Sequence, residues 1–370
     1  MFDMSSNQAD KLKISEGSVF LYGDDAPYSN NEFITRLKKI SESNEIANDS
    51  YSIGGEVGKL ESAMAKRLGK EASVFFPTGT LANHVAIRQL CLPQKRAIVP
   101  EQSHIYQDSG DSVQQLSGVN LVPLGSTNPY FSLDELKESL NASISGRVVN
   151  PVGVVVIESP VRRCYGRLMP YEDMKAITGY CRELGIPTHL DGARLFIASS
   201  ITQVPLQKYS HLFDTVYISM WKYFRAPYGA ILAGSKEFCE NLFHVRRMFG
   251  GSLPFSSLSA ALALDGLKHF EKDAQLAVSQ SKELLELLSR IPNIEVNHYE
   301  DESNIIPVAF SDKVNLQNLD RTLRSKGVFI NPETSGQNTI HLTINMTILR
   351  KSNQELLKAF TEALETSVTI

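Results

Sequence analysis

Apolar residues recur along the chain in short uninterrupted runs. Such runs favour buried strands, whereas apolar residues spaced three or four apart predict helices. Helical spacing falls between several of the runs, at residues 81–90, 133–140 and 171–184. This alternation predicts an α/β fold with a mostly parallel seven-stranded sheet and helices on both of its faces. The seven runs are residues 73–77, 97–100, 121–124, 152–158, 187–190, 215–220 and 229–233.

The two ends of the chain have different patterns. Residues 1–17 are polar, and helical spacing follows at 31–43 and 57–68. After Gly250-Gly251 the pattern predicts long helices within 256–288 and then a smaller α+β part. We therefore predict an N-terminal segment at 1–50 that packs on the small domain, a large domain at 51–255, and a small C-terminal α+β domain at 256–370. A short strand-like run lies at 19–25 near the N-terminus. The C-terminal elements are strands at 294–296, 305–310, 328–330 and 340–344, with helices at 316–323 and 352–364.

Composition narrows the class of protein. The chain has 370 residues and a formal net charge of −4, which argues against nucleic acid as the main partner. The sequence has no apolar run long enough to cross a bilayer, and its N-terminus lacks the apolar core of a signal peptide. The four cysteines form no CxxC pair and indicate thiols in a reducing cytoplasm.

One lysine follows the sixth apolar run almost at once. Lys222 precedes Pro227 and Gly229, after which the seventh run begins. Two buried strands joined by a short turn would present this lysine at a strand end. Desolvation in a cleft lowers the pKa of a lysine amine and makes it a nucleophile. The alternative is a surface lysine in a loop.

Thr78-Gly79-Thr80 joins the first apolar run to a helical pattern. Gly79 lets a ligand approach the backbone, and the helix start offers unpaired N–H groups and a positive dipole end. This combination predicts an anion site suited to a phosphate. The alternative is an ordinary N-cap by one of the two threonines.

Two further candidates follow strand ends. Asp191 is placed to hold a proton on a heteroaromatic nitrogen; the alternatives are a helix cap and a salt bridge with Arg194. A metal site at His189 and Asp191 lacks an evident third ligand, so we predict no metal. His104 is suited to stacking on a flat cofactor or to moving a proton, with a buried hydrogen-bonded histidine as the alternative.

Together these candidates form one constellation at the strand carboxyl ends of the predicted sheet, where ligands of such sheets bind. An anion cradle, an acid for a pyridine nitrogen and a lysine are the parts needed to bind pyridoxal 5′-phosphate. Lys222 would form the Schiff base, and Ser219 would add a hydroxyl to the phosphate site. The predicted catalytic residues are Lys222, His104 and Asp191, and the predicted cofactor-binding residues are Thr78, Gly79, Thr80, His104, Asp191, Arg194, Ser219 and Lys222.

Four blocks carry a resemblance to a known family: Phe76–Asn83, Gln102–Ile105, His189–Phe196, and Lys222 with Ala226-Pro227 and Gly229. The sequence resembles the low-specificity L-threonine aldolases, which belong to the β-eliminating lyase group of pyridoxal-phosphate enzymes with the aspartate aminotransferase type of fold (fold type I). The resemblance implies homodimers or homotetramers with active sites at the subunit interface. It also implies that His104 stacks on the cofactor ring and that Arg194 holds the substrate carboxylate.

The substrate side of the predicted site departs from that family. The family's Arg-Ser-Asp-Thr block is replaced by a segment that keeps only Asp24, and its Glu-Asn-Thr-His block by one that ends in Val161. His341 stands where a second carboxylate-binding arginine is expected, so Arg162 or Arg163 would supply that charge. The predicted substrate-binding residues are Arg194, Asp24, Arg162 and His341, and the nearest candidates for the base are Asp108 and His104.

These observations lead to a hypothesis and two alternatives. The hypothesis is a pyridoxal-phosphate-dependent lyase that cleaves a β-hydroxy-α-amino acid to glycine and an aldehyde, with threonine itself cleaved poorly. One alternative is another reaction of the cofactor, β-elimination or transamination, on a different amino acid. The other is a non-catalytic protein that keeps the fold. The predicted partners are a small-molecule amino acid substrate and further copies of the chain, with neither nucleic acid nor membrane.

Overall fold

The computed structural model describes residues 16–333 and 338–368. The predicted polar segment 1–17 therefore lies outside the described residues except at its last two positions. Among the described residues, none of the helices combines the length and the apolar character that crossing a bilayer requires.

The chain divides into two compact units. The sheet unit comprises Tyr28–Glu271 together with Glu300–Ser303. The terminal unit comprises the residues up to Pro27, Lys272–Tyr299 and the residues from Asn304 onward. The predicted domain boundaries at residues 50 and 255 differ from these unit boundaries and stay a prediction.

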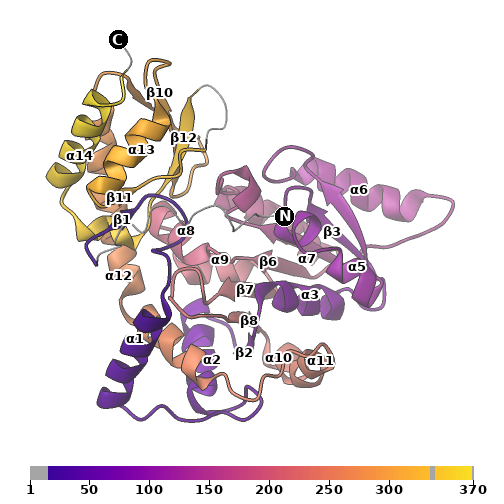
Figure 1. The fold of residues 1–370 in the computed structure, drawn as a ribbon. Helices are drawn as coiled ribbons and strands as arrows, with labels where there is room; N and C mark the ends of the chain where they lie inside the picture. The colour runs from indigo at the N-terminus through magenta and orange to yellow at the C-terminus, as the bar shows by residue number, and fades with distance from the viewer. Residues whose placement is uncertain (1–15, 334–337, 369–370) are drawn as a thin grey trace. The chain divides into compact units, whose positions relative to one another are not determined.

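A seven-stranded sheet forms the centre of the sheet unit (Figure 1). Each strand overlaps one of the seven predicted apolar runs, so the predicted sheet is confirmed. Four of the strands, at Val154–Glu158, Thr188–Asp191, Thr215–Ser219 and Ala230–Gly234, are buried at every position, as expected for the central strands of a sheet that is covered on both faces. In sheet order the strands are β2 (Ala72–Phe76), β8 (Ala230–Gly234), β7 (Thr215–Ser219), β6 (Thr188–Asp191), β5 (Val154–Glu158), β3 (Arg96–Pro100) and β4 (Asn120–Leu124).

The strand directions decide which residues share an edge of the sheet. Strands β3 to β7 run parallel, whereas β8 is antiparallel to both of its neighbours, β7 and β2. A strand that is antiparallel to both neighbours leaves those neighbours parallel to each other. The carboxyl end of β2 therefore lies on the same edge as the carboxyl ends of β3, β5, β6 and β7, and the prediction of a mostly parallel sheet is confirmed.

Helices cover both faces of this sheet. On β2, Phe76 packs with Val85 of α3 (Gly79–Leu90), while the Ser73 hydroxyl donates to the Glu61 carbonyl of α2 (Gly55–Leu68) at 2.7 Å. Positions 73 and 76 of a strand point to opposite faces, so α2 and α3 lie on opposite sides of the sheet. The other helices of this unit are α1 (Asn30–Ser43), α4 (His104–Gln107), α5 (Ser112–Ser117), α6 (Leu133–Ser145), η1 (Arg162–Cys164), α7 (Tyr171–Glu183), α8 (Leu195–Thr202), α9 (Leu206–Leu212), α10 (Lys236–Glu240) and α11 (Leu242–Met248).

Several short helices were not predicted. Helices α4, α5, α8, α9, α10 and α11 have four to eight residues each. A helical period becomes recognisable over roughly 11–18 residues, so these segments are too short to show one. Two of them matter for the site, because α4 begins at His104 and α8 begins directly after Arg194.

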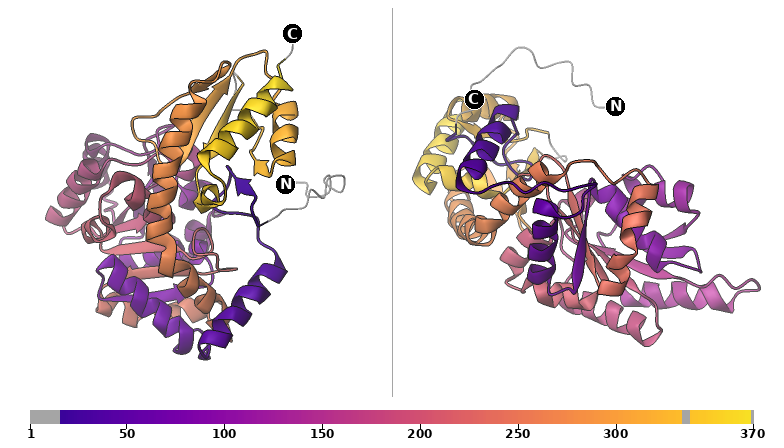
Figure 2. Two further views of the ribbon diagram at one scale, coloured as in Figure 1. Left: turned by 90° about the vertical axis from the view of Figure 1, so that its left-hand side faces the viewer. Right: turned by 90° about the horizontal axis from the view of Figure 1, so that it is seen from below.

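The terminal unit contains the predicted α+β elements. Strands β12 (Thr339–Thr343), β10 (Ile305–Phe310) and β9 (Ile294–Val296) form an antiparallel sheet in that order, and β1 (Val19–Phe20) pairs in parallel with β11 (Val328–Phe329). Helices α13 (Leu316–Ser325) and α14 (Asn353–Glu365) bury apolar faces in its core, and η2 (Met346–Arg350) precedes α14. The segment predicted as long helices is one 32-residue helix, α12 (Ser257–Leu288), which belongs partly to each unit (Figure 2).

Candidate active site

The predicted cofactor-binding residues follow strands that end at one edge of the sheet. Thr78, Gly79 and Thr80 follow β2, His104 follows β3, Asp191 ends β6, and Lys222 follows β7. Because the carboxyl ends of these strands share an edge, residues up to 144 positions apart in the sequence (222 − 78) are brought to one side of the sheet. Ligands of open α/β sheets bind at such an edge.

The start of α3 is capped and closely packed. The Thr78 side chain accepts a hydrogen bond from the Leu81 amide at 3.2 Å, so the ordinary N-cap that the sequence allowed is present. A Cβ atom on Gly79 would lie 1.9 Å from the Tyr217 hydroxyl oxygen, so only glycine fits at this position. The first amides of α3 and the buried Tyr217 hydroxyl therefore meet at the point where the sequence predicted a phosphate cradle.

His104 connects this cradle to the next strands. Its Nε2 lies 3.2 Å from the Thr80 hydroxyl oxygen, and its Nδ1 lies 3.9 Å from the nearer carboxylate oxygen of Asp108. Its backbone amide donates to Glu158 at 2.5 Å. The His104 side chain is about one third exposed, so the imidazole is held by these contacts but remains partly accessible.

Asp191 lies in a buried hydrogen-bond network. Its carboxylate accepts from the Asn83 side-chain amide at 2.5 Å and from the Ala193 amide at 3.2 Å. Asn83 in turn bonds the His189 Nε2 at 2.9 Å, and the His189 Nδ1 lies 2.8 Å from the Thr215 hydroxyl. Burial lowers the pKa of His189 to about 3, so this ring is neutral near pH 7. Both of its nitrogens serve the network that orients Asp191.

Glu158 is a second buried carboxyl beside Asp191. The two residues stand opposite each other on neighbouring parallel strands. Glu158 accepts hydrogen bonds from the backbone amides of His104 at 2.5 Å and Arg162 at 3.2 Å. Burial, and then the negative charge of Asp191, raise the pKa of Glu158 to about 8. One proton is therefore held at this pair of carboxyls near pH 7, and Glu158 fixes the start of α4, where His104 lies.

The raised pKa of Glu158 predicts a pH-dependent stability. In the unfolded chain a glutamate ionises above roughly pH 4.3, whereas in the folded protein Glu158 keeps its proton up to about pH 8. Between these values the unfolded chain binds fewer protons, so the free energy of unfolding falls as the pH rises. We expect Glu158→Gln to remove a fall on the order of a few kcal/mol from denaturant titrations of the cofactor-free protein.

Glu138→Gln, on an exposed position of α6, is the matched control and should leave the pH profile of stability unchanged. An identical fall in stability in the wild-type and Glu158→Gln proteins would contradict the proposed protonation of Glu158.

The segment that carries Lys222 joins β7 to β8 as the sequence predicted. We call residues 220–229 the lysine loop. Its ends are tied by the Met220 amide, which donates to the Gly229 carbonyl at 3.0 Å. Gly229 has φ +127°, and a Cβ there would lie 2.7 Å from the Phe75 ring, so a larger residue would not fit. The Lys222 amine lies 5.6 Å from the centre of the half-exposed Trp221 ring.

The arginines predicted to bind substrate are placed differently from one another. Arg194 is the N-cap residue of α8, and its positive charge lowers the pKa of Glu158, after the larger opposing effects of burial and Asp191. Arg163 forms an ion pair with Asp108 at 2.9 Å, and Arg162 lies 3.8 Å from the same carboxylate. Asp108, one of the two predicted bases, is thus surrounded by positive charge, while Arg194 is associated with the strand-end carboxyls.

The other two predicted substrate-binding residues belong to the terminal unit. Asp24 lies in the segment before α1, and His341 lies on β12. Burial lowers the pKa of His341, which keeps this imidazole neutral near pH 7. The part of both residues in a substrate site stays a prediction.

Sequence reasoning missed three residues of this site, namely Asn83, Glu158 and Tyr217. Asn83 is a polar residue one turn after Gly79 on the buried face of α3, and Glu158 ends an apolar strand in the same way as Asp191. Both positions carried a recognisable signal, because a buried polar group requires partners. Tyr217 lies in an apolar strand, where an aromatic residue cannot be told from an ordinary core residue.

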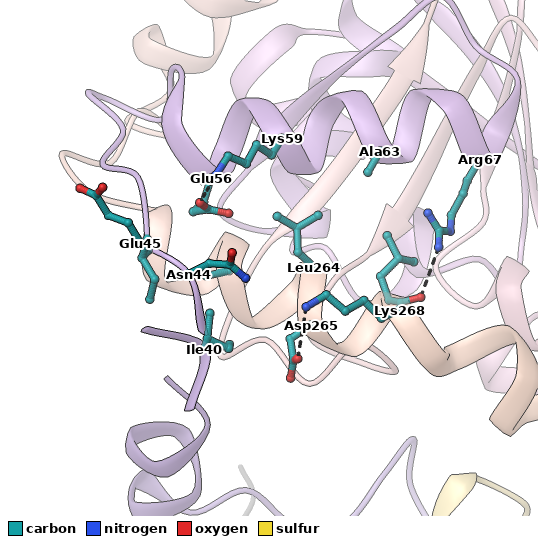
Figure 3. Close-up of a pocket in the computed structure, with 13 residues that line it drawn as sticks. Ile40, Asn44, Glu45, Glu56, Lys59, Ala63, Arg67, Leu264, Asp265 and Lys268 are labelled. Atoms are coloured by element: carbon teal, nitrogen blue, oxygen red, sulfur yellow. Dashed lines mark hydrogen bonds and ion pairs between the residues drawn. The ribbon is translucent and has the colours of Figure 1, made fainter. Parts of the chain in front are cut away.

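Two pockets of about 410 Å³ each lie elsewhere on the sheet unit. The first is lined by the end of α1 with its following loop, by α2 and by α12, and it contains the ion pairs Glu56–Lys59 and Asp265–Lys268 (Figure 3). The second is lined by tyrosines and acids that include Tyr130 and Asp301. The residues lining these two pockets do not include the predicted cofactor-binding residues.

Comparison with known proteins gives the same family as the sequence motifs. The family model for β-eliminating lyases matches residues 40–311. The low-specificity L-threonine aldolase of Saccharomyces cerevisiae is 31% identical over 228 residues, which are 60% of this chain and 57% of the yeast protein. The alanine racemase TOXG of Cochliobolus carbonum is 29% identical over 232 residues, covering 62% of this chain and 58% of that protein.

A solved structure shows the likeness over nearly the whole chain. A Listeria monocytogenes protein, provisionally named an L-allo-threonine aldolase, superposes with a TM-score of 0.80 and 25% identity. The superposition covers 96% of this chain and 98% of the Listeria chain. The fold predicted from the motifs, that of the pyridoxal-phosphate aldolases and transferases, is therefore confirmed.

Proposed function

The chain belongs to the β-eliminating lyase family, and on that premise we propose that it is a pyridoxal-phosphate-dependent carbon–carbon lyase. Its substrate would be a β-hydroxy-α-amino acid, cleaved to glycine and an aldehyde. The observation that carries this proposal is the shared sheet edge, where an anion cradle, a buried carboxylate and a lysine come from three parallel strands.

The residues at this edge fit the cofactor. The amides at the start of α3, with Gly79 and Thr80, would hold a phosphate at the positive end of the helix, and the Tyr217 hydroxyl lies against Gly79 at the same place. Asp191 is oriented by Asn83 and would hold the proton of a pyridine nitrogen. When bound, pyridoxal phosphate supplies an electron-withdrawing ring that stabilises negative charge at the substrate Cα. Lys222 is the amine that would attach it.

The protein's own groups would divide the remaining work. Arg194 would bind the substrate carboxylate, since a guanidinium pairs with a carboxylate in a bidentate and directional way. His104, whose side chain is partly exposed, would stack on the cofactor and would move a proton. We favour His104 over Asp108 as the base, because Asp108 is engaged by Arg163 and Arg162.

We expect the protein to release glycine from a β-hydroxy-α-amino acid, and threonine to be a poor substrate. The histidine that the family places near the substrate hydroxyl is replaced by Val161. Losing a positioned base typically costs about 10²–10⁴ in rate. The assay measures glycine and aldehyde released from threonine, allo-threonine and phenylserine. Cleavage of threonine at ordinary aldolase efficiency would show that the replaced residue does not matter, and no glycine from any of the three would contradict the proposed reaction.

A second reaction of the same cofactor is favoured by one comparison, since a relative of similar identity is named an alanine racemase. Racemisation needs proton transfer at Cα without cleavage of a carbon–carbon bond. Chiral analysis of alanine after incubation with the cofactor-loaded protein separates the two reactions. A yellow protein whose visible spectrum responds to no amino acid would instead support the non-catalytic alternative.

We also propose that the active unit is at least a dimer. Support comes from the exposed apolar side chains in two segments, 51–53 and 248–258, which are joined by the Tyr51 amide donating to the Pro254 carbonyl. Exposed apolar clusters of this kind mark interaction surfaces. The exposed apolar residues of these two segments are Tyr51, Ile53, Met248, Phe255 and Leu258. Light scattering should find a species of at least twice the 41.1 kDa of the chain, and a monomer at working concentration would contradict the proposal.

We also propose that the protein is located in the cytoplasm. All four cysteines are free, and three of them are buried. Burial raises the pKa of the Cys91 thiol to about 11, so this thiol is unreactive near pH 7. Free thiols are consistent with the reducing cytoplasm that the sequence predicted.

A further inference from the structure

The lysine loop is held from outside the sheet by the first helix of the unit. The Tyr28 hydroxyl, just before α1, donates to the Trp221 carbonyl at 2.9 Å and lies 3.4 Å from the Lys222 carbonyl. On α1, the Arg36 guanidinium donates to the Arg225 carbonyl at 2.8 Å. A segment of fewer than ten residues thus contacts three backbone carbonyls of the lysine loop, those of Trp221, Lys222 and Arg225.

Arg225 occupies a backbone conformation that needs support. Its φ is +55°, in the left-handed region that non-glycine residues seldom adopt. Its guanidinium forms an ion pair with Glu32 of α1 and lies 5.9 Å from the centre of the Tyr28 ring. Unusual backbone conformations persist where surrounding contacts determine them, and here α1 contacts both the carbonyl and the side chain of Arg225.

Arg36 also ties the loop to α12. Its second terminal nitrogen donates to the Leu262 carbonyl at 3.2 Å and to the Asp265 carboxylate at 3.1 Å. The Arg36 side chain is mostly buried by these contacts, and Asp265 is held on its other side by Lys268. A planar guanidinium is suited to bonding several acceptors at once, which a lysine is not.

Helix α12 supports the loop directly. A Cβ on Gly266 would lie 2.1 Å from the Phe224 carbonyl oxygen, so the helix backbone and the lysine loop are in direct contact. The Phe224 ring packs edge-on against Phe196 at 4.9 Å and Phe270 at 5.3 Å between ring centres. The side of the loop that faces α12 is therefore packed through apolar and backbone contacts, whereas α1 holds it through polar groups.

Helix α1 has little other support of its own. None of its residues is buried, and its Ile34 side chain is 62% exposed. Polar contacts with the lysine loop and with α12 therefore join α1 to the rest of the sheet unit.

We propose that Arg36 and Glu32 of α1 are positioning residues that act through Arg225 to hold the lysine loop, and so set how Lys222 is presented to the cofactor. This inference rests on the proposed function for the identity of the ligand. We call the contacts of Arg36 and Glu32 with Arg225 the grip. These contacts lie within the chain, so their effect on the lysine loop can be measured in the cofactor-free protein.

The test compares Arg36→Ala and Glu32→Gln with Lys39→Ala, an exposed position on the same helix. Hydrogen exchange of the cofactor-free protein is followed at the Met220 and Ala226 amides, which bond within the loop. We expect exchange there to be at least tenfold faster in both grip variants and unchanged in Lys39→Ala, with thermal unfolding reporting that each variant folds. Arg36→Lys should restore only part of the protection, because a lysine ammonium cannot bond the Arg225 carbonyl and the acceptors on α12 at the same time.

A second readout concerns the cofactor-loaded protein. We expect the midpoint of its visible absorption change with pH to shift in the grip variants and to stay in place in Lys39→Ala. Wild-type exchange and an unmoved midpoint in folded grip variants would overturn the proposal. If Arg36→Ala does not fold, Glu32→Gln decides the question by the same two measurements. A wild-type protein that forms no borohydride-reducible adduct at Lys222 would instead overturn the proposed function. The hydrogen-exchange result would then still decide whether Arg36 and Glu32 hold the lysine loop.

Discussion

Replacing Lys222 by alanine should abolish the covalent attachment of pyridoxal phosphate. The lysine follows β7 at the sheet edge that holds Thr80, His104 and Asp191, so we propose that its amine is the nucleophile that bonds the cofactor carbonyl carbon. We expect borohydride to fix the cofactor to a peptide containing Lys222 in the wild-type protein, and mass spectrometry to find no such peptide in Lys222→Ala. Glycine release should fall by several orders of magnitude.

Two variants separate nucleophilicity from charge. Lys222→Arg keeps a positive charge on the lysine loop but cannot form the covalent bond, so it should lose the adduct as completely as Lys222→Ala. Lys236→Ala removes an exposed lysine just after β8 and should keep the adduct in full. A borohydride-stable cofactor on any peptide of Lys222→Ala would assign the attachment to another amine.

The strand-end residues could be predicted because burial leaves a strong sequence pattern. Each of His104, Asp191 and Lys222 stands where an apolar run stops, and the parallel order of the strands brings such positions together. The seven-stranded sheet and the α+β elements of the terminal unit could be predicted for the same reason. Short helices such as α4 and α8 left no period in the sequence, and their positions depend on the strands before them.

The supporting contacts could not be predicted in the same way. Arg36 and the carbonyl it bonds are 189 positions apart, and the bond leaves no periodic or compositional trace at either end. The ion pairs of Asp108 with Arg162 and Arg163 also join separate segments of the chain. The arginine charge that we predicted for the substrate carboxylate is therefore paired with Asp108. Contacts between polar side chains depend on tertiary packing, which apolar patterns specify only coarsely.

Replacing Asp191 by alanine should weaken cofactor binding and lower turnover by orders of magnitude. Its carboxylate accepts from Asn83 at 2.5 Å and would pair with a protonated ring nitrogen. Removing one partner of a buried, hydrogen-bonded charge pair typically costs about 3–5 kcal/mol, which corresponds to a factor of roughly 10²–10⁴ in an equilibrium constant. Fluorescence titration with pyridoxal phosphate measures the loss, and glycine release measures the effect on turnover.

The control variants decide whether charge or shape is responsible. Asp191→Asn preserves the shape and one acceptor for Asn83 but lacks the charge, so it should not restore activity. Asp214→Asn alters a carboxylate that bonds the Thr188 amide at 2.7 Å, at the opposite ends of the same strands, and should leave cofactor affinity unchanged. Removing the Asp191 charge should also lower the pKa of Glu158, since that charge contributes to raising it. An Asp191→Ala protein with near-wild-type turnover would show that the ring-nitrogen proton is held by another group, and Glu158, the neighbouring buried carboxyl, would be the first to test.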